Sequence, residues 1–270
     1  MDITGFALIT GAASGIGRAC ASAFVKEGAG GVALFDLNAR ALEDVQKDLE
    51  QEAASHPARR CRILVQAVDV VDEDAVTHAV NATAKEFGRI DYVVNSAGIA
   101  FKHAGGSAEA ASSDWHRVLD VNLNGTFYVY RAAAKIMLRQ DHLQSSVDQR
   151  PLQRGSIINI ASILGVVGVP LSTAYCASKH AVIGLTRTAS EDYSSEGLRI
   201  NAVCPGYIDT PIITPGVVAQ VALEKTRVWT PMRRFGTANE VADAVVFLAG
   251  GRSSYVTGTA LMVDGGYTSR

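Results

Sequence analysis

The stretch FALITGAASGIG, residues 6–17, joins a short apolar run to a glycine-rich turn and the start of a helical pattern. The apolar run is typical of a buried strand, and the helical pattern continues to about Glu27. The glycine spacing is G-x-x-x-G-x-G, not the common G-x-G-x-x-G, so these glycines could serve only to make a tight turn. However, glycines also let the backbone approach a bound group closely, and the free N–H groups of a new helix favour a pyrophosphate. The stretch therefore predicts a dinucleotide site with contacts from Gly11, Ser14, Gly15, Ile16 and Gly17.

Strand and helix patterns then alternate along the chain in units of about thirty residues. Such units imply right-handed parallel crossovers, with ligands bound beyond the carboxyl ends of the strands. We predict an α/β fold, a single doubly wound Rossmann-like domain over residues 1–270 with a seven-stranded parallel sheet. The strands after the first are expected at residues 31–35, 62–68, 91–95, 155–160, 199–203 and 260–263.

Asp36 ends the second predicted strand, about twenty residues after the glycine turn. A carboxylate at this place can accept hydrogen bonds from the adenosine ribose hydroxyls. It would repel a 2′-phosphate, and the following Leu37 brings no cation, so NAD is favoured over NADP, although Arg40 lies close in sequence. Asp36 could also cap the helix predicted for residues 38–54.

Two more strand ends carry candidate cofactor contacts. Asp69 and Val70 follow the third strand, where an acceptor and a small apolar side chain could meet an adenine edge, although Asp69 could instead be a helix cap. After the fourth strand, Asn95 can tie backbone segments together, while Ala97 and Gly98 leave room for a ribose. A purely structural turn at Asn95 fits the pattern equally well.

The motif Tyr175-Cys176-Ala177-Ser178-Lys179 lies in a helical pattern over residues 173–196. A separation of four places Tyr175 and Lys179 on one face, one turn apart. A fixed cation beside a phenol favours phenolate and lowers the phenol pKa. The pair is therefore a candidate acid/base unit, although the same spacing on a helix could be merely a solvated face.

The composition limits the class of partner. The chain has 270 residues, 25 basic against 27 acidic side chains and a net charge of -2, so it has no electrostatic footprint for nucleic acid or an anionic membrane. Four scattered cysteines indicate free thiols, and the histidines show no metal-ligand spacing. No apolar run is long enough to span a bilayer, and the first strand leaves no room for a cleavable signal. We expect a cytoplasmic protein whose partners are small molecules or like subunits, with no metal.

Residues 10–17, the element Asn95-Ser96-Ala97-Gly98 and the pair Tyr175 and Lys179 together resemble the short-chain dehydrogenase/reductase family in its common form of about 250 residues. The resemblance covers nearly the whole chain. Ser96 stands where the family usually has a second Asn. The family resemblance implies a nicotinamide cofactor and a homo-oligomer, a tetramer or dimer.

The resemblance also implies roles for individual residues. Ser162, thirteen residues before Tyr175, would hold the substrate oxygen against the phenol. Lys179 would grip the nicotinamide ribose, and Asn122 would hold a water that links Lys179 to solvent. Asn122 lies on a helix predicted over residues 113–139 and could also simply satisfy backbone groups or kink that helix. The segment that closes over the nicotinamide would contribute Pro205, Gly206, Ile208 and Thr210.

The expected activity is reversible hydride transfer between NAD(H) and a secondary alcohol or ketone, with Tyr175 as the acid/base. A substrate lid is expected at residues 209–232 and a polar surface loop with some disorder at residues 140–154. The segment after Ser162 indicates an apolar pocket wall of Leu164, Val166, Val167 and Val169. Apolar residues in the lid indicate a substrate with sizeable apolar surface, although they could instead pack the lid: Ile212, Ile213, Val217, Val218 and Trp229. The alternatives are an NADP-dependent ketone reductase, a non-redox lyase or isomerase, and a dinucleotide-binding scaffold.

Overall fold

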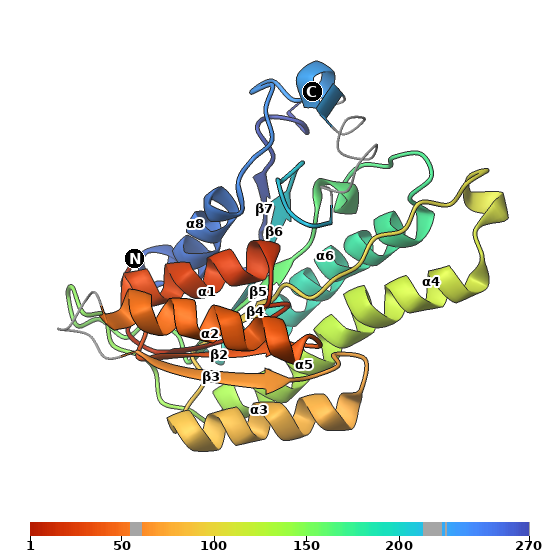
Figure 1. The fold of residues 1–270 in the computed structure, drawn as a ribbon. Helices are drawn as coiled ribbons and strands as arrows, with labels where there is room; N and C mark the ends of the chain where they lie inside the picture. The colour runs from red at the N-terminus through yellow and green to blue at the C-terminus, as the bar shows by residue number, and fades with distance from the viewer. Residues whose placement is uncertain (55–60, 213–222, 225, 270) are drawn as a thin grey trace.

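The protein is built around one sheet of seven parallel strands in the order β3-β2-β1-β4-β5-β6-β7 (Figure 1). The computed structural model describes residues 1–54, 61–212, 223–224 and 226–269. The sheet confirms the predicted α/β, Rossmann-like fold and its seven parallel strands. The strands are β1 (Phe6–Thr10), β2 (Gly31–Asp36), β3 (Arg62–Ala67), β4 (Tyr92–Asn95), β5 (Gly155–Ile160), β6 (Leu198–Pro205) and β7 (Ala260–Val263).

The strand order reverses between β1 and β4. The chain runs outward from β1 through β2 to β3 and then returns to place β4 on the other side of β1. Helices on opposite faces leave a crevice at such a point, beyond the carboxyl ends of the strands. Thr10, which pairs with Asn95 in register, ties this point together, because its hydroxyl oxygen accepts hydrogen bonds from the backbone N–H groups of Ser96 and Ala97, each at 3.1 Å.

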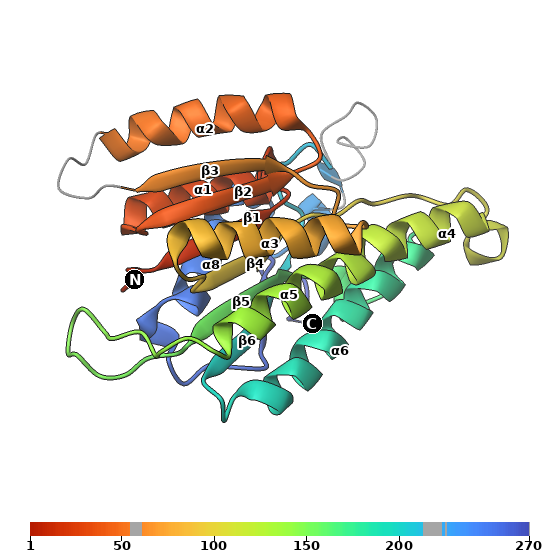
Figure 2. The same cartoon turned by 90° about the horizontal axis from the view of Figure 1, so that it is seen from below.

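Helices cover both faces of the sheet (Figure 2). Side chains of α1, α2 and α8 share one apolar cluster with the sheet, and those of α3, α5 and α6 share the other. The described α-helices are α1 (Gly15–Glu27), α2 (Ala39–Ala54), α3 (Glu73–Phe87), α4 (Ser112–Leu119), α5 (Thr126–Met137), α6 (Thr173–Tyr193) and α8 (Ala238–Ala249). Short helical turns lie at Ser107–Glu109, Asp120–Gly125, Ile163–Gly165 and Gly251–Ser253.

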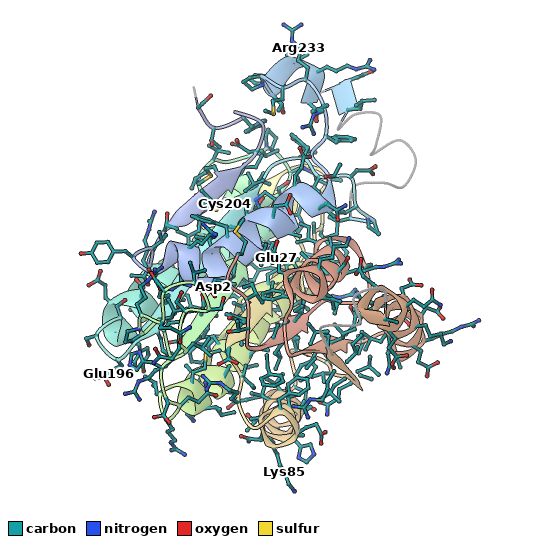
Figure 3. All side chains as sticks on the ribbon, turned by 90° about the vertical axis from the view of Figure 1, so that its left-hand side faces the viewer. Asp2, Glu27, Lys85, Glu196, Cys204 and Arg233 are labelled. Carbon is teal, nitrogen blue, oxygen red and sulfur yellow. The ribbon has the colours of Figure 1, made fainter. Side chains whose placement is uncertain are left out.

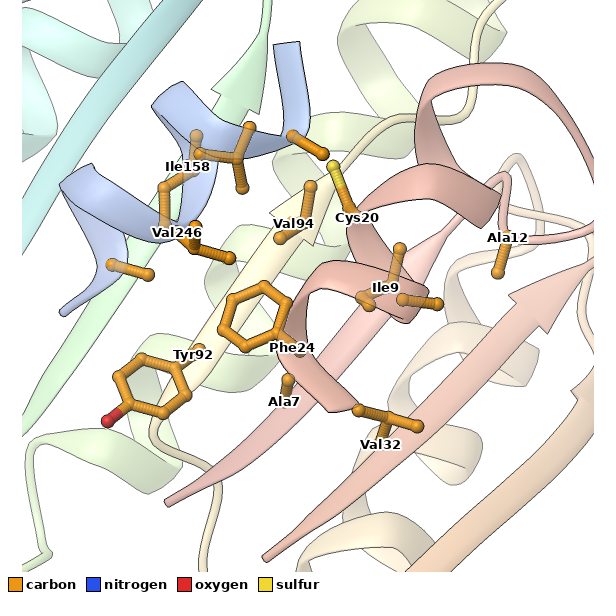
Figure 4. Packing of buried hydrophobic residues seen from close by; sticks show 14 of the residues in the cluster. Ala7, Ile9, Ala12, Cys20, Phe24, Val32, Tyr92, Val94, Ile158 and Val246 are labelled. Atoms are coloured by element: carbon orange, nitrogen blue, oxygen red, sulfur yellow. The ribbon is translucent and has the colours of Figure 1, made fainter. Parts of the chain in front are cut away.

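The strands are apolar on both sides because both faces are covered. In β1, Ile9 belongs to the cluster under α1, and the adjacent Leu8 belongs to the cluster under α3 and α5. Phe24 of α1 packs on Tyr92 of β4 with ring centroids 5.5 Å apart (Figure 4). Burial of a side chain such as Phe24 contributes roughly 1.5–3 kcal/mol to folding. Cys204 of β6 is fully buried, and Figure 3 labels its position among the side chains.

Helix caps resolve two alternatives that the sequence left open. The Asn38 side chain, not that of Asp36, accepts from the Ala41 N–H at 3.1 Å and so caps the start of α2. Asp72 caps α3 by accepting from Ala75 N–H. Neither Asp36 nor Asp69 is therefore the residue that caps the following helix.

The helix predicted over residues 113–139 is present as a continuous helical segment from Ser112 to Met137, but it is not α-helical throughout. The structure has α4, then a π-helical turn over Asp120–Gly125, then α5. Such turns insert extra backbone into an α-helix and often mark functional sites. Gly125 permits the wide turn to pack closely, because a Cβ there would lie 2.7 Å from Cγ2 of Val70.

Residues 140–154 have a defined structure where the sequence predicted some disorder. Backbone hydrogen bonds join Leu143 to Gln153 and Ser145 to Arg150, which makes the segment a hairpin. It is also tied to the rest of the protein, because Ser146 donates to the Asp2 carboxylate and Gln153 donates to the carbonyl of Ala249. The hairpin lies beside the amino terminus and the end of α8 (Figure 2).

The predicted lid is only partly described. Ile213, Val217 and Val218 fall within residues 213–222, outside the described residues, whereas Ile212 and Trp229 are described and are 56% and 49% exposed. All four cysteines are free thiols. Within the described ranges, no helix combines the length and the apolar character needed to cross a bilayer.

Candidate active site

A cleft of about 660 Å³ opens at the carboxyl ends of the strands, and most of the predicted site residues line it. Gly17, Asn95 and Asn122 do not line it and are buried. The apolar residues expected near the substrate after Ser162 do not line it either: Leu164, Val166, Val167 and Val169. The predicted residues that line the cleft are Gly11, Ser14, Gly15, Ile16, Asp36, Leu37, Asp69, Val70, Ala97, Gly98, Ser162, Tyr175, Lys179, Pro205, Gly206, Ile208 and Thr210.

The glycine turn between β1 and α1 forms a compact cradle at one end of the cleft. A Cβ on Gly17 would lie 2.1 Å from the carbonyl oxygen of Gly11, so only glycine allows the helix to begin this close to the turn. Ser14 occupies the N-cap position of α1, but its side chain makes no capping hydrogen bond. The first N–H groups of α1 therefore face the cleft as donors for an anionic group.

Asp36 is oriented by two backbone hydrogen bonds. Its Oδ2 accepts from Ala13 N–H at 3.1 Å, and its Oδ1 accepts from Asn38 N–H at 3.0 Å. The carboxylate thus ties the glycine turn to the end of β2 and keeps lone pairs for further donors at the cleft. Leu37 beside it is 72% exposed.

Asp69 and Val70 form the next part of the wall. Asp69 is exposed, and its Oδ1 accepts from Val71 N–H at 3.1 Å, which fixes the turn after β3. Val70 is 8% exposed and packs against the π-helical turn at Gly125. This pair offers an acceptor beside an apolar surface.

The side chain of Asn95 is buried and forms hydrogen bonds within the protein. Its Nδ2 donates to Oδ1 of Asn159 at 2.9 Å, and Asn159 in turn donates to the Thr186 hydroxyl, so a buried polar chain links β4, β5 and α6. Ala97 and Gly98 continue from Asn95 into the cleft. A Cβ on Gly98 would lie 3.3 Å from Oδ1 of Asn122 and 3.6 Å from Nζ of Lys179.

Asn122 is fully buried, and its side chain is saturated with protein partners. Oδ1 accepts from Ile99 N–H at 2.8 Å, and Nδ2 donates to the Ile99 carbonyl at 2.9 Å and to the Ser178 hydroxyl at 3.0 Å. These bonds fix the loop after β4 against α6. The side chain therefore performs the structural role that the sequence left open, and its role in a water relay stays a prediction.

Tyr175 and Ser162 meet at the other end of the cleft. The Ser162 hydroxyl accepts from Leu164 N–H at 3.1 Å, which fixes its rotamer, and its hydrogen bond with the Tyr175 phenol lowers the phenol pKa. Burial has the larger and opposite effect, so the pKa of Tyr175 is raised to about 12. The two hydroxyls are placed to share one oxygen of a ligand.

Lys179 lies one helical turn from Tyr175, as the spacing predicts, and its ammonium lies over the Tyr175 ring. Nζ donates to the carbonyl oxygen of Ile160 at 2.7 Å and lies 5.6 Å from the centroid of the Tyr175 ring. Burial lowers the pKa of Lys179 to about 8. The pKa of Tyr175 in the free protein is raised and not lowered as the spacing predicts, because desolvation of the phenol outweighs the effects of its neighbours.

The segment after β6 forms the facing wall. Gly206 packs so tightly on the turn at Asp264 that a Cβ would lie 2.8 Å from its Cα, and Thr210 faces Gly15 at van der Waals distance. Burial raises the pKa of Cys204, just before this segment, to about 11, which keeps the thiol protonated and a poor nucleophile near neutral pH.

One wall of the cleft is formed by residues that the sequence did not predict as part of the site. It comes from α4 and the turn that follows it. The spacing of its polar members, at i, i+3, i+4 and i+7, marks a single helix face and was the available signal. The residues are Ser113, His116, Arg117, Asp120 and Val121. Arg117 also stacks over the Phe101 ring at 5.4 Å.

Known proteins match nearly the whole chain. A protein-family model described as Enoyl-(Acyl carrier protein) reductase matches residues 11–268. The chain is 42% identical to the short-chain dehydrogenase fogB of Aspergillus ruber, over 99% of this chain and 98% of that protein. It is 36% identical to the 3-oxoacyl-[acyl-carrier-protein] reductase FabG of Thermotoga maritima, over 96% of each. Among solved structures, levodione reductase superposes with a TM-score of 0.86 and 34% identity, over 99% of both chains.

Proposed function

The chain belongs to the short-chain dehydrogenase/reductase family and is an oxidoreductase, and from this premise we propose that it transfers a hydride between NAD(H) and a secondary alcohol or ketone with sizeable apolar surface. The observation that carries the proposal is that a single cleft joins the glycine cradle at the start of α1 to Ser162, Tyr175 and Lys179. A dinucleotide is the kind of ligand that spans such a cleft.

The residues present fit a nicotinamide dinucleotide. The open N-terminus of α1 would hold the pyrophosphate, and Asp36 would accept from the adenosine ribose. Asp69 and Val70 would meet the adenine, and Lys179 would hold the nicotinamide ribose in the space left by Gly98. The segment with Pro205, Gly206, Ile208 and Thr210 would close over the carboxamide end.

The preference for NAD over NADP rests on Asp36. Its carboxylate is fixed at the end of β2 by the N–H groups of Ala13 and Asn38, so it cannot turn away from a 2′-phosphate without losing both bonds. The nearby Arg40 is exposed. The only cations among the described residues that line the cleft are Lys179 and Arg117.

The proposed chemistry gives Tyr175 the proton and the cofactor the hydride. When bound, NAD⁺ would accept the hydride from the alcohol carbon and bring a positive charge near the phenol. Ser162 orients the substrate hydroxyl, and Tyr175 as phenolate takes its proton while the carbonyl forms. In the reverse direction, the Tyr175 phenol returns the proton to the alkoxide oxygen. Asn122 supports this arrangement by fixing the loop that carries Gly98.

The proposal also covers the substrate lid, the oligomeric state and the cellular location of the enzyme. Residues 209–232 would cover the substrate, and Ile212, which lines the cleft and is 56% exposed, would contribute to an apolar contact surface. A homo-oligomer, tetramer or dimer, in the cytoplasm is part of the same proposal. Light scattering of the purified protein would measure its assembly.

The test follows nicotinamide absorbance over a panel of secondary alcohols and ketones with NAD(H) and, separately, NADP(H). We expect turnover, with the higher kcat/KM for NAD(H). Calorimetry with NAD alone provides the control. If the protein binds NAD but turns over no substrate, a scaffold is favoured. If it converts a substrate in a cofactor-dependent way with no net absorbance change, a lyase or isomerase is favoured. If it binds neither dinucleotide, the proposal is refuted.

A further inference from the structure

Ser178 is a buried serine that the proposed function leaves without a role. It follows Tyr175 by three residues, directly precedes Lys179, and is fully buried within α6. A buried hydroxyl needs hydrogen-bond partners, and those of Ser178 connect it to the active site. Its oxygen accepts from Nδ2 of Asn122 at 3.0 Å, and its hydrogen is donated to the carbonyl oxygen of Tyr175 at 2.8 Å. The Ser178 hydroxyl therefore bridges the side chain of Asn122 and the backbone of Tyr175.

The Asn122 end of this bridge is held firmly. The Asn122 side chain bonds both the N–H and the carbonyl of Ile99, and the Thr126 hydroxyl donates to the Asn122 carbonyl at 2.8 Å. Ile99 lines the cleft directly after Gly98. A chain of hydrogen bonds thus runs from the loop that lines the cleft, through Asn122 and Ser178, to the backbone of Tyr175.

The Tyr175 end of the bridge lies where a helix needs support. Tyr175 is the third residue of α6, and the side chain of Ser172 at the N-cap position makes no capping hydrogen bond. The first turn of a helix has N–H groups without intrahelical partners, and helix ends fray. The bond from Ser178 therefore restrains a turn that its own N-cap side chain does not restrain.

The position of this turn decides whether two hydroxyls meet. The Tyr175 phenol is hydrogen-bonded with Ser162, whose own hydroxyl is fixed by Leu164 N–H. A small movement of the first turn of α6 would separate the phenol from Ser162. Proton transfer requires groups within hydrogen-bond reach, so such a movement would slow the reaction much more than it would weaken cofactor binding.

We propose that Ser178 is a positioning residue, which bridges Asn122 to the Tyr175 carbonyl and so holds the phenol against Ser162. This inference rests on the proposed function. It goes further by giving Asn122 an influence on Tyr175 that passes through hydrogen bonds within the protein.

Ser178→Ala tests the proposal, and the same helix supplies a matched control. Ser190 is 3% exposed, and its hydroxyl also donates to the carbonyl three residues earlier, that of Arg187, at 2.8 Å. Ser190→Ala therefore removes the same kind of bond at a distance from Tyr175. For oxidation of a secondary alcohol with NAD⁺, Ser178→Ala should lower kcat by about 10- to 100-fold with little change in KM for NAD⁺. Ser190→Ala should keep wild-type kcat.

The pH dependence of kcat separates positioning from a general loss of structure. The hydrogen bond with Ser162 lowers the pKa of the Tyr175 phenol, so loosening it should move the rise of kcat with pH to higher pH. This shift is expected in Ser178→Ala and not in Ser190→Ala. Both variants should melt within about 5 °C of the wild type. Wild-type kcat and pH dependence in Ser178→Ala, or an equal loss of kcat in Ser190→Ala, would overturn the inference.

A nuclear magnetic resonance measurement distinguishes failure of this inference from failure of the proposed function. In protein labelled with ¹³C at the tyrosine Cζ atoms, the Tyr175 signal is the one that disappears in Tyr175→Phe, and its chemical shift reports the surroundings of the phenol without any turnover. A signal that moves in Ser178→Ala and not in Ser190→Ala would support the positioning role even in a protein that oxidises no alcohol. A signal that stays in place in Ser178→Ala would overturn that role.

Discussion

The ammonium of Lys179 donates to the carbonyl oxygen of Ile160, 2.7 Å away, and not to the phenol of Tyr175. Ile160 ends β5 and Lys179 lies on α6, so the bond joins the carboxyl end of β5 to the helix that carries Tyr175. Lys179 is 5% exposed, and its burial lowers its pKa to about 8. The free protein therefore holds a buried cation whose desolvation opposes its hydrogen bond to Ile160 and its contact with the Tyr175 ring.

Replacing Lys179 with Met should stabilise the free protein near pH 7 while it abolishes turnover. Between pH 8 and 10.5 the unfolded chain keeps a proton on Lys179 that the folded chain has lost, so the wild type gains stability as the pH rises through this range. Below pH 8 the full cost remains, roughly 3 kcal/mol if taken from the two pKa values. We expect Lys179→Met to be more stable by about 1–3 kcal/mol at about pH 7, with a smaller difference near pH 9.5.

Urea denaturation of both proteins at the two pH values measures this difference. The thiols and phenols that both proteins share titrate in the same way, so their contributions cancel in the difference between the two free energies of unfolding. A Lys179→Met protein that is less stable than the wild type at pH 7 would show that the bond to Ile160 outweighs the desolvation of the ammonium.

Tyr175→Phe should lower kcat by about 10²- to 10⁴-fold and leave NAD affinity nearly unchanged. The substitution removes the proposed acid/base but keeps the ring in place. Tyr193→Phe, at the opposite end of the same helix, is the matched control and should keep wild-type turnover. Stopped-flow or steady-state absorbance measures turnover, and calorimetry measures NAD binding. Near-normal turnover of Tyr175→Phe would exclude this phenol as the proton carrier.

Binding of NAD⁺ should lower the pKa of Tyr175 from its value of about 12 in the free protein. The reason is electrostatic, because a positive ring beside the phenol favours phenolate. Ultraviolet difference titration of wild type against Tyr175→Phe, with and without NAD⁺, isolates this one phenol. A transition at the same pH with and without NAD⁺ would mean that the bound cofactor does not activate Tyr175.

Asp36→Asn should raise the ratio of kcat/KM for NADP to that for NAD by at least about tenfold. Like charges about 4 Å apart near a protein surface repel by roughly 1–4 kcal/mol, and the substitution removes that repulsion of a 2′-phosphate. Asp48→Asn is the control, since Asp48 is 56% exposed and pairs with Arg18 on the surface. If Asp48→Asn changes the ratio equally, the preference comes from net charge and not from the position of Asp36.

The sequence allowed the sheet and the cleft to be predicted because their signals are local. Apolar runs bounded by glycine and acidic residues define the strands, and parallel crossovers bring every strand end to one edge. The direction of the Lys179 ammonium could not be predicted, because it depends on the carbonyl of Ile160, nineteen residues away. The face of α4 was missed for a similar reason, since its polar residues resemble an ordinary solvated helix until the fold places them at the cleft.

The hairpin of residues 140–154 shows the same limit, because a polar segment with Pro151 resembles a loop when its distant partners are unknown. One of its contacts is with Arg199 of β6, which is 6% exposed and donates to the carbonyls of Ala249 and Gly250 and to Oε1 of Gln153 in the hairpin. The guanidinium thus connects the hairpin to the end of α8, far along the sequence.

Arg199→Met should lower the free energy of unfolding by about 3 kcal/mol, because it removes several buried, charge-assisted hydrogen bonds at once. Arg150→Met is the matched control. Arg150 also donates to a backbone carbonyl, that of Gly251, but its side chain is 45% exposed, so water can replace it and the loss should stay within about 1 kcal/mol. Urea denaturation measures both. Because the hairpin lies away from the cleft, turnover of folded Arg199→Met should match the wild type. Equal losses of unfolding free energy in the two variants would show that the burial of Arg199 adds no stability beyond that of an exposed arginine.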